Sequence, residues 1–348
     1  MNPNPAVLLI LRAPETIRNQ YYQGITAAFP HLTVTLIDHI SKADPYLATT
    51  DIIVTHGPYL EDKADHMLRN AGNLKWVQGI GTGVDNIADR PALRREVMVT
   101  NIHGVHGAPM AEAAMGLMLA LSRQLPRSLA NKAQHKWENW PSRVLAGKTV
   151  GILGVGVIAE AMAPRFKAFE MTVIGISSGP RPLPGFDRMV DRTSLLEVVP
   201  ELDYFLVLTP YSPASRHIIN AKVLGAMKAS SYLINLARGG VLDEAALLAV
   251  LRENRIAGAA LDVYAREPLP PDNPFWDLPN VILTCHQAAT NENSARNNVP
   301  IICENIRRFM AGDFAGMTNV VKRIGDPPHD PPILSRLCRP HQARSTYR

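Results

Sequence analysis

Cysteine is rare in this sequence, and long apolar runs are missing from it. Only Cys285, Cys303 and Cys338 occur among 348 residues, without a CxxC spacing or a neighbouring group of histidines. This pattern argues against disulfide bonds and against a zinc site. No apolar run approaches the roughly 20 residues of a membrane-spanning helix, and no basic stretch precedes the first apolar segment, VLLIL. We therefore expect a cytoplasmic protein without a bound metal.

Most of the chain also lacks an excess of one charge sign. The formal net charge is +5, but residues 321–348 alone carry six basic and two acidic side chains. A nucleic-acid surface needs basic side chains spread over a folded face, so their confinement to this segment argues against nucleic acid as a partner. The segment also contains PPHDPP and shows little apolar periodicity. We predict a disordered basic tail over 321–348.

Two series of short apolar runs dominate the rest of the chain. The first comprises AVLLIL, LTVTLID, DIIVTHG, LKWVQGI and VMVTNI, and the second comprises KTVGILGVG, MTVIGISS, YFLVLTP, SYLINLA, IAGAALDVY and NVILTCH. Polar or helix-compatible segments separate the runs. Nearly continuous apolar strands are typical of parallel sheets that helices cover on both faces. The pattern predicts an α/β fold with two parallel-sheet domains of the Rossmann or flavodoxin kind.

The order of these runs predicts the extent of each domain. We assign residues 101–286 to a dinucleotide-binding domain, and residues 1–100 together with 287–320 to a discontinuous substrate domain. The second segment is included because we expect a helix from about Asn291 to Met310 to return to the first domain. Alanine and leucine content and a 3.6-residue apolar stripe predict another helix from about Ala108 to Arg123.

A glycine-rich segment follows the first strand of the second series. Gly154, Gly156 and Ala159 match the pattern G-x-G-x-x-A between a predicted strand and a predicted helix. The first glycine permits a tight turn, the second lets the backbone approach a pyrophosphate, and the alanine allows close packing of helix on strand. The N–H groups of Val157 and Ile158, at the helix start, would face the phosphates. This context predicts a dinucleotide-binding loop.

No acidic residue stands at the end of the next predicted strand, where Asp or Glu would bind the adenosine ribose of NAD. The strand ends at Ser177 and Ser178, and Arg181 follows shortly after. A guanidinium can form paired, charged hydrogen bonds with a 2′-phosphate, which favours NADP over NAD. The alternative is that Arg181 is a solvated loop residue and that both cofactors are used.

Three segments lie at the ends of later predicted strands, where an open α/β sheet binds its ligand. They are NLARGGVLDE (235–244), ALDVYAREPLP (260–270) and ILTCHQAAT (282–290). Together with GKTVGILGVG and LTPYSPASRHIIN, they resemble the D-isomer-specific 2-hydroxyacid dehydrogenase family, over residues 6–320. The resemblance implies hydride transfer between NAD(P)H and a 2-oxo acid, an active site in the cleft between the two domains, and a homodimer.

The resemblance places the family's catalytic residues on Arg238, Glu267 and His286. Their chemistry suits the reaction, because reduction of a 2-oxo acid needs a proton donor for the developing alkoxide. An imidazolium beside a carboxylate stays protonated near neutral pH, so His286 would supply the proton and Glu267 would orient the ring. Arg238 would bind the substrate carboxylate through paired hydrogen bonds that lysine cannot reproduce.

The same resemblance adds four cofactor contacts, Thr209, Pro210, Ala237 and Asp262. Asp262 would meet the nicotinamide carboxamide. In the turn GTGVD, the backbone N–H groups of Thr82 and Gly83 would bind the substrate carboxylate. Side chains around Thr55, His56 and Gly57 would contact the variable group of the substrate.

One position departs from the family pattern, and one segment has two interpretations. The family usually has proline before the histidine, where this chain has Cys285. Hydride transfer needs no thiol nucleophile, so we expect Cys285 to be a small core residue. The segment HKWENW, from His135 to Trp140, is expected either in the dimer contact or in core packing.

Several functions stay open at this point. Reduction of glyoxylate or hydroxypyruvate is favoured on family grounds. Formate and phosphite dehydrogenases share the architecture but would need a site shaped for a one-centre anion. Nucleotide-sensing corepressors also resemble this family and can keep the same catalytic residues. Turnover would separate an enzyme from such a binding protein.

Overall fold

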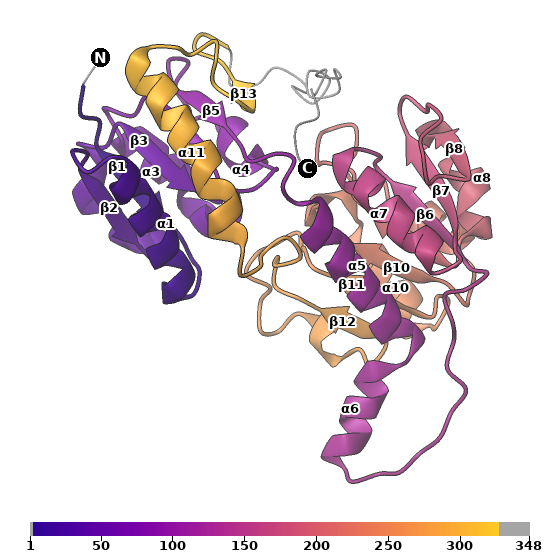
Figure 1. The fold of residues 1–348 in the computed structure, drawn as a ribbon. Helices are drawn as coiled ribbons and strands as arrows, with labels where there is room; N and C mark the ends of the chain where they lie inside the picture. Colours follow the sequence, from indigo (N-terminus) through magenta and orange to yellow (C-terminus); the bar gives the residue numbers. More distant parts are fainter. Residues whose placement is uncertain (1–2, 327–348) are drawn as a thin grey trace. The chain divides into compact units, whose positions relative to one another are not determined.

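The computed structural model describes residues 3–326 and divides the chain into two compact units (Figure 1). Among these residues, unit 1 contains 3–103 and 293–326, and unit 2 contains Gly104–Glu292. Both divisions fall where the chain has no helix or strand, a few residues after the predicted boundaries at 100/101 and 286/287.

Unit 1 is built on a six-stranded sheet with the order β13-β5-β4-β3-β1-β2. Its strands are β1 (Val7–Ile10), β2 (Val34–Ile37), β3 (Ile52–Thr55), β4 (Trp76–Gly79), β5 (Met98–Thr100) and β13 (Val320–Lys322). The first five are parallel, and β13 pairs with β5 in the antiparallel direction. All residues of β1, β3 and β4 are buried, which is why these strands stand out as apolar runs.

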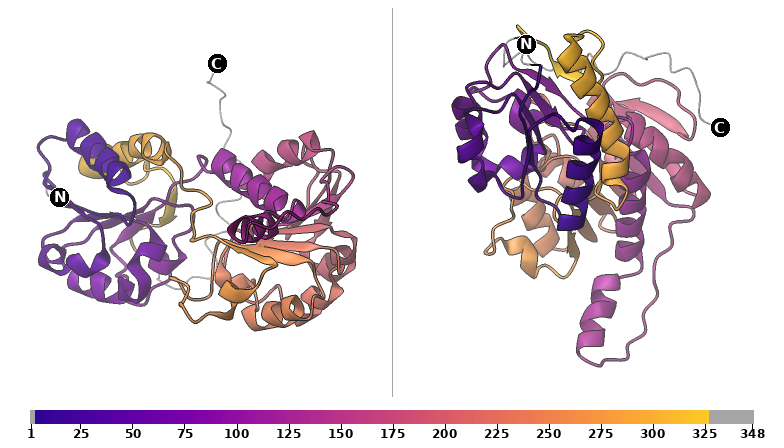
Figure 2. Two further views of the ribbon diagram at one scale, coloured as in Figure 1. Left: turned by 90° about the horizontal axis from the view of Figure 1, so that it is seen from below. Right: turned by 60° about the vertical axis from the view of Figure 1, so that its left-hand side comes forward.

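Helices cover both faces of the unit 1 sheet (Figure 2). They are α1 (Glu15–Ala28), α2 (Asp44–Leu47), α3 (Ala64–Asn70), α4 (Asp85–Ala88) and α11 (Ser294–Ala311), with the 3-10 helices η1 (Ile40–Lys42) and η2 (Gly57–Lys63). α1 and α11 lie side by side (Figure 1). Gly24 permits their close approach, since a Cβ there would lie 2.7 Å from Val299 Cγ1. Asn305 of α11 also bonds Gln78 of β4 at 3.1 Å, which ties this helix to the sheet.

The predicted disordered tail begins too early. Val320–Lys322 form β13, and the Lys322 side chain is fully buried. Its Nζ donates hydrogen bonds to the carbonyl oxygens of Arg95 at 3.0 Å and Val97 at 2.8 Å. Pairing with β5 supplies partners for the backbone, and apolar periodicity does not reveal such pairing. The prediction is therefore wrong for 321–326, and its remainder, 327–348, lies outside the described residues.

Unit 2 is built on a seven-stranded, fully parallel sheet with the order β12-β11-β10-β9-β6-β7-β8. Its strands are β6 (Thr149–Leu153), β7 (Thr172–Ser177), β8 (Arg188–Asp191), β9 (Tyr204–Val207), β10 (Tyr232–Asn235), β11 (Gly258–Leu261) and β12 (Val281–Leu283). All except β8 coincide with predicted apolar runs. β8 lies at one edge of the sheet. Its sequence, RMVD, is mixed and none of its residues is fully buried, so it shows no apolar run.

Helices also cover both faces of the unit 2 sheet (Figure 2). They are α5 (Gly107–Ser122), α6 (Leu125–Ala133), α7 (Val157–Ala168), α8 (Leu195–Val198), α9 (Ala221–Ala226) and α10 (Glu244–Arg252), with η3 (Arg192–Ser194), η4 (Val199–Glu201), η5 (Gly239–Val241) and η6 (Pro274–Asp277). α5 packs against α7 through Gly107, where a Cβ would lie 2.8 Å from Ala161 Cβ. α6 extends away from the sheet, and a long extended segment leads from its far end back toward β6 (Figure 1).

These two units confirm the predicted fold class of two parallel-sheet α/β domains. The location of the active site in a cleft between them stays a prediction. Over residues 3–326, no helix combines the length and apolar character needed to cross a bilayer.

Candidate active site

The strand order of unit 2 reverses between β6 and β9. From β6 the chain builds β7 and β8 on one side, and it then builds β9 to β12 on the other side. Connections from these two central strands therefore leave in opposite directions, which opens a crevice at their carboxyl ends. Two predicted cofactor residues follow these strands, Gly154 after β6 and Thr209 after β9.

Gly154 is required by both its conformation and its surroundings. Its φ angle is +97°, in the region that side chains other than glycine rarely adopt. A Cβ at this position would lie 2.5 Å from the backbone nitrogen of Thr209. Thr209 is buried and Pro210 is exposed beside it. The loop after β6 thus rests directly on the loop after β9.

Gly156 leaves open space where a pyrophosphate could approach. A Cβ on Gly156 would meet no atom within 4 Å, and no side chain caps the start of α7. Gly156 and Val157 are exposed, Ile158 is partly exposed, and Ala159 is fully buried. The N–H groups of the first helical turn carry the positive end of the helix dipole. The loop therefore fits the phosphates of a dinucleotide.

The residues predicted to select the cofactor lie at the end of β7. Ser177 is partly buried, whereas Ser178 and Arg181 are exposed. Nη2 of Arg181 lies 3.2 Å from Oε1 of Glu160, which belongs to α7. This ion pair places Arg181 beside the helix that follows the cofactor loop. The sequence did not indicate Glu160, because an i to i+21 contact has no local pattern.

Arg238, Glu267 and His286 follow the adjacent strands β10, β11 and β12. Parallel strands end at the same edge of a sheet, so the three residues belong to one end of unit 2. Oε2 of Glu267 lies 2.7 Å from Nδ1 of His286. These two side chains are mostly buried, with 21% and 19% of their surface exposed. The structure thus brings the predicted acid and imidazole into direct contact.

Asp262 anchors the loop that carries His286. Its side chain is buried, and its Oδ1 accepts hydrogen bonds from Thr284 Oγ1 at 2.5 Å and from the N–H of Gln287 at 3.0 Å. Its Oδ2 accepts a hydrogen bond from the N–H of Ala288 at 3.0 Å. The carboxylate predicted to meet the nicotinamide is therefore also the main support of this loop.

The backbone of His286 adopts a left-handed conformation, with φ of +50°. This conformation is uncommon for residues with a side chain, although His tolerates it better than most. The N–H of His286 donates to the carbonyl oxygen of Asp262 at 2.7 Å, which fixes the turn. Since Nδ1 faces Glu267, Nε2 is the ring nitrogen on the opposite side.

Arg238 lies in a turn that Asn235 braces. Nδ2 of Asn235 donates to the carbonyl oxygen of Arg238 at 3.1 Å, and its Oδ1 accepts from the N–H of Ala237 at 3.1 Å. Nη1 of Arg238 donates to the carbonyl oxygen of Ala237 at 2.7 Å. Ala237 is buried and Arg238 is partly buried. Ala237, a predicted cofactor contact, therefore also accepts a hydrogen bond that holds the Arg238 side chain.

Tyr264, which was not among the predicted site residues, also supports the loops at this end of the sheet. Its hydroxyl lies 2.8 Å from the carbonyl oxygen of Leu261 and 2.7 Å from that of Thr284. Burial raises the pKa of Tyr264, so its hydroxyl remains a donor over a wide pH range. Its position between Asp262 and Glu267 was the one available signal.

The predicted substrate residues lie at the carboxyl ends of β3 and β4 in unit 1. His56 follows β3, and its ring packs closely on Gly81. If Gly81 had a Cβ, that atom would lie only 2.7 Å from His56 Nε2. The His56 ring also contacts the Tyr59 ring edge-on at 4.9 Å between centroids. Thr82 and Gly83 are partly exposed, and the carbonyl oxygen of Thr82 accepts a hydrogen bond from Asn101 Nδ2 at 2.6 Å.

Two expectations about individual side chains were wrong. Thr55 is fully buried, and its hydroxyl donates to the carbonyl oxygen of Ile10 at 3.1 Å, so it faces the sheet instead of a ligand. Cys285 is exposed, with its Sγ 3.7 Å from Gln287 Oε1, and is not a core residue. The reason is that β12 ends at Leu283, before the cysteine.

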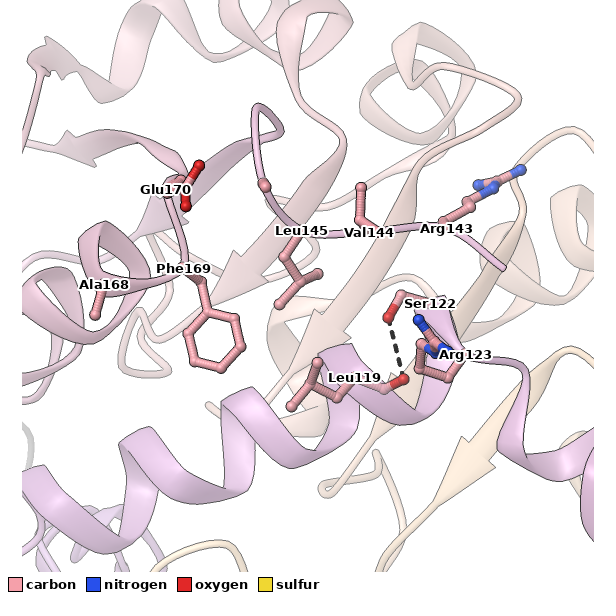
Figure 3. Close-up of a pocket in the computed structure, with 10 residues that line it drawn as sticks. Leu119, Ser122, Arg123, Arg143, Val144, Leu145, Ala168, Phe169 and Glu170 are labelled. Atoms are coloured by element: carbon pink, nitrogen blue, oxygen red, sulfur yellow. Dashed lines mark hydrogen bonds between the residues drawn. The ribbon is translucent and has the colours of Figure 1, made fainter. Parts of the chain in front are cut away.

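A shallow pocket of about 290 Å³ lies at the opposite edge of unit 2. Its walls come from the end of α5, the segment before β6 and the end of α7, as Figure 3 shows for Leu119, Leu145 and Phe169. Ligands of open α/β sheets bind at the carboxyl ends of the strands, whereas this pocket lies near their amino ends. We therefore do not assign it to the active site.

The fold and the site together define a Rossmann-type dinucleotide-binding protein. A family model described as "D-isomer specific 2-hydroxyacid dehydrogenase, NAD binding domain" matches residues 115–288. D-3-phosphoglycerate dehydrogenase from Methanocaldococcus jannaschii is 33% identical over 289 residues, which cover 80% of this chain and 52% of that protein. The chain thus spans about half the length of this curated relative.

Solved structures match along nearly the whole of both chains. A D-isomer specific 2-hydroxyacid dehydrogenase family protein from Aeromonas salmonicida is 30% identical, with a TM-score of 0.79, over 91% of this chain and 99% of that one. The NADPH-dependent glyoxylate/hydroxypyruvate reductase from Sinorhizobium meliloti, solved with NADP and sulfate, is 29% identical, with a TM-score of 0.76, over 93% and 100%. The chain belongs to the D-isomer specific 2-hydroxyacid dehydrogenase family.

Proposed function

We propose that this protein is an oxidoreductase that interconverts 2-oxo and D-2-hydroxy acids with a nicotinamide cofactor. The observation that carries this proposal is the 2.7 Å contact between Glu267 and His286. The pair lies at the carboxyl edge of the sheet that also bears the loop of Gly154 and Gly156. An acid–base pair and a dinucleotide loop at one sheet edge are what hydride transfer coupled to proton transfer requires.

In the reducing direction, His286 donates a proton to the carbonyl oxygen of the substrate through Nε2. Glu267 orients the ring and stabilises its positive charge. Arg238 binds the carboxylate of the 2-oxo acid and polarises the neighbouring carbonyl. In the oxidising direction, His286 accepts the proton from the hydroxyl group.

The cofactor supplies or accepts the hydride when it is bound. The loop of Gly154 and Gly156 would hold its pyrophosphate, while Thr209, Pro210 and Ala237 would line the rest of its path and Asp262 would meet the carboxamide. We favour NADP, because Ser177, Ser178 and Arg181 offer hydroxyl and guanidinium donors to a 2′-phosphate. The Sinorhizobium meliloti relative, which was solved with NADP, supports this preference.

We favour glyoxylate or hydroxypyruvate as the substrate. The Sinorhizobium meliloti reductase with these substrates in its name supports this choice. Thr82, Gly83 and His56, which belong to unit 1, would contact the substrate. A cytoplasmic location, and the absence of nucleic acid and membrane partners, remain predictions.

The test is a panel of 2-oxo acids assayed with NADH and NADPH in parallel. In the oxidising direction, formate, phosphite and 3-phosphoglycerate are assayed separately with NAD+ and NADP+ as hydride acceptors. Turnover of glyoxylate or hydroxypyruvate with NADPH is the expected result. Binding of NADPH without turnover of any compound would reject the enzyme and favour a nucleotide-sensing binding protein.

We expect His286→Asn and Arg238→Lys each to lower kcat/KM by about two to three orders of magnitude, or roughly 3–4 kcal/mol. Asn cannot donate the proton, and Lys cannot make the paired contact. Steady-state kinetics measures both effects. Arg255→Gln is the control, because Arg255 pairs with Glu253 at 2.8 Å on the surface. Near-normal kcat/KM in either active-site variant would remove that residue from the mechanism.

A further inference from the structure

Glu244 is a second carboxylate that bonds the segment carrying Glu267. It is the first residue of α10, and its Oε1 accepts a hydrogen bond from the N–H of Ala265 at 2.7 Å. The preceding N–H group, that of Tyr264, donates to Oε1 of Glu267 at 2.9 Å. Two consecutive peptide N–H groups are therefore held by two different glutamates.

The same peptide also packs against the turn that follows Arg238. A Cβ on Gly239 would lie 1.8 Å from the carbonyl carbon of Tyr264 and 2.2 Å from the nitrogen of Ala265. The peptide is thus in direct contact with one active-site turn and hydrogen-bonded to the start of α10. Any shift of it would move Glu267 against His286. A misplacement of about 1 Å is enough to reduce a proton-transfer rate strongly.

The N-cap of α10 does not depend on Glu244. Asp243 already caps α10, because its Oδ1 accepts a hydrogen bond from the N–H of Ala246 at 3.0 Å. Burial, together with the charge of Glu267, raises the pKa of Glu244, while the Ala265 N–H and His217 act in the opposite direction. The hydrogen bond from the Ala265 N–H therefore ties the start of α10 to the segment that carries Glu267.

We propose that Glu244 is a positioning residue for the Glu267–His286 pair. By accepting the Ala265 N–H, it fixes the segment that carries Glu267 and thereby sets the orientation of His286 for proton transfer. The kinetic part of this inference rests on the proposed function, whereas the hydrogen bond itself can be tested without turnover.

The kinetic test compares three substitutions at Glu244. We expect Glu244→Ala to lower kcat about ten- to a hundredfold with KM within twofold, because Glu244 touches the loop and not the substrate. Glu244→Asp keeps the charge but is one methylene shorter, so it should lose a similar part of kcat. Glu244→Gln should return to within about threefold of the wild type, because its amide oxygen can accept the same N–H.

Glu253→Ala is the matched control, because it removes a carboxylate just after the other end of α10 and should leave kcat and KM unchanged. A wild-type kcat in both Glu244→Ala and Glu244→Asp would overturn the inference. It would also be overturned if Glu244→Gln lost as much as Glu244→Ala.

The second test measures hydrogen exchange of the Ala265 N–H by NMR in the full chain, with thermal unfolding as a check that each variant is folded. Exchange should accelerate at least tenfold in Glu244→Ala and stay near the wild-type rate in Glu244→Gln. If the wild type reduces no 2-oxo acid, the proposed function fails, yet the exchange result still decides the role of Glu244. An unchanged exchange rate of the Ala265 N–H in Glu244→Ala would show that Glu244 does not hold this segment in place.

Discussion

At the residue scale, the Arg181–Glu160 ion pair bears on cofactor choice. Both partners are solvent-exposed, with 64% and 40% of their side chains accessible. Exposed ion pairs contribute little to stability, so a 2′-phosphate can displace Glu160 from the guanidinium. The same carboxylate would repel that phosphate.

We expect Glu160→Gln to lower KM for NADPH about two- to fivefold and to leave KM for NADH within twofold, since the amide neither repels the phosphate nor holds the guanidinium by charge. Steady-state kinetics with both cofactors measures the change. Glu201→Gln is a matched control, because Glu201 forms a similar exposed pair with Arg188 at 2.8 Å. Equal changes with the two cofactors would show that the ion pair lies away from the phosphate.

Glu244 also predicts a pH dependence of stability. Its pKa in the folded protein is raised above the ordinary value of 4.5, so its protonated form is favoured by folding. The stability that it contributes is fully present below about pH 4.5 and is lost as the pH rises through the folded pKa. We expect the Tm of Glu244→Gln, relative to wild type, to increase by about 2 °C between pH 4 and pH 7.

Calorimetry across this pH range measures the difference. Glu253→Gln serves as control and should follow the wild type at every pH. A Tm difference that is constant or falls with pH would contradict the raised pKa of Glu244. If Glu244→Gln had a higher Tm than the wild type at pH 7 and kept its kcat, the hydrogen-bond-accepting oxygen of residue 244, and not its charge, would be what the active site needs.

At the scale of the element, Glu138 holds α6 against the segment that follows it. We call α6 and this segment, residues 125–141, the arm. The Glu138 carboxylate accepts hydrogen bonds from Arg127 at 2.6 Å and from Asn131 at 2.9 Å, and it pairs with Lys136 at 3.2 Å. The Arg127 guanidinium also lies 4.4 Å from the centre of the Trp140 ring. These partners, Arg127 first, lower the pKa of Glu138 to about 2.

Because the pKa of Glu138 is lowered, the stability that its contacts contribute is present above about pH 4.5 and is lost as the pH falls toward 2. We expect Glu138→Gln to reproduce part of that loss at neutral pH, with hydrogen exchange of residues 134–141 rising about three- to tenfold. Hydrogen exchange followed by mass spectrometry measures this increase. Glu197→Gln, an exposed glutamate on α8, should not change exchange in the arm. A protected arm in Glu138→Gln would contradict the role of this carboxylate.

At the scale of the whole molecule, the arm presents unusual apolar surface. Trp137 is 100% exposed, and Leu129 and Leu125 of α6 are 65% and 48% exposed. Core packing of the segment HKWENW is therefore excluded for Trp137, which leaves the dimer contact as its predicted role. Large apolar side chains that are exposed on the surface often mark a protein–protein contact.

We expect the wild type to elute as a dimer of the 38.2 kDa chain and Leu129→Glu to shift it toward the monomer. A buried carboxylate in an apolar interface has no partner, so it weakens association. Light scattering coupled to size exclusion measures the mass. Leu196→Glu is the control, since Leu196 is 49% exposed on α8. A monomeric wild type, or a dimeric Leu129→Glu, would reject the arm as the interface.

The sequence by itself determined the α/β class, nearly all of the strands and the order of the site motifs. These features depend on local properties: buried strands are apolar along their length, and the turn at Gly154 needs a residue without a side chain. The positions of Arg238, Glu267 and His286 after successive strands also followed from chain order, because parallel strands end at one edge.

Tertiary structure alone decided the rest. β8 and β13 exist because a neighbouring strand supplies their hydrogen bonds, and neither has an apolar run of its own. Contacts such as Glu244 with Ala265 or Arg181 with Glu160 join residues about twenty positions apart. No local pattern encodes such a contact, because its energy arises only after distant strands have been placed side by side.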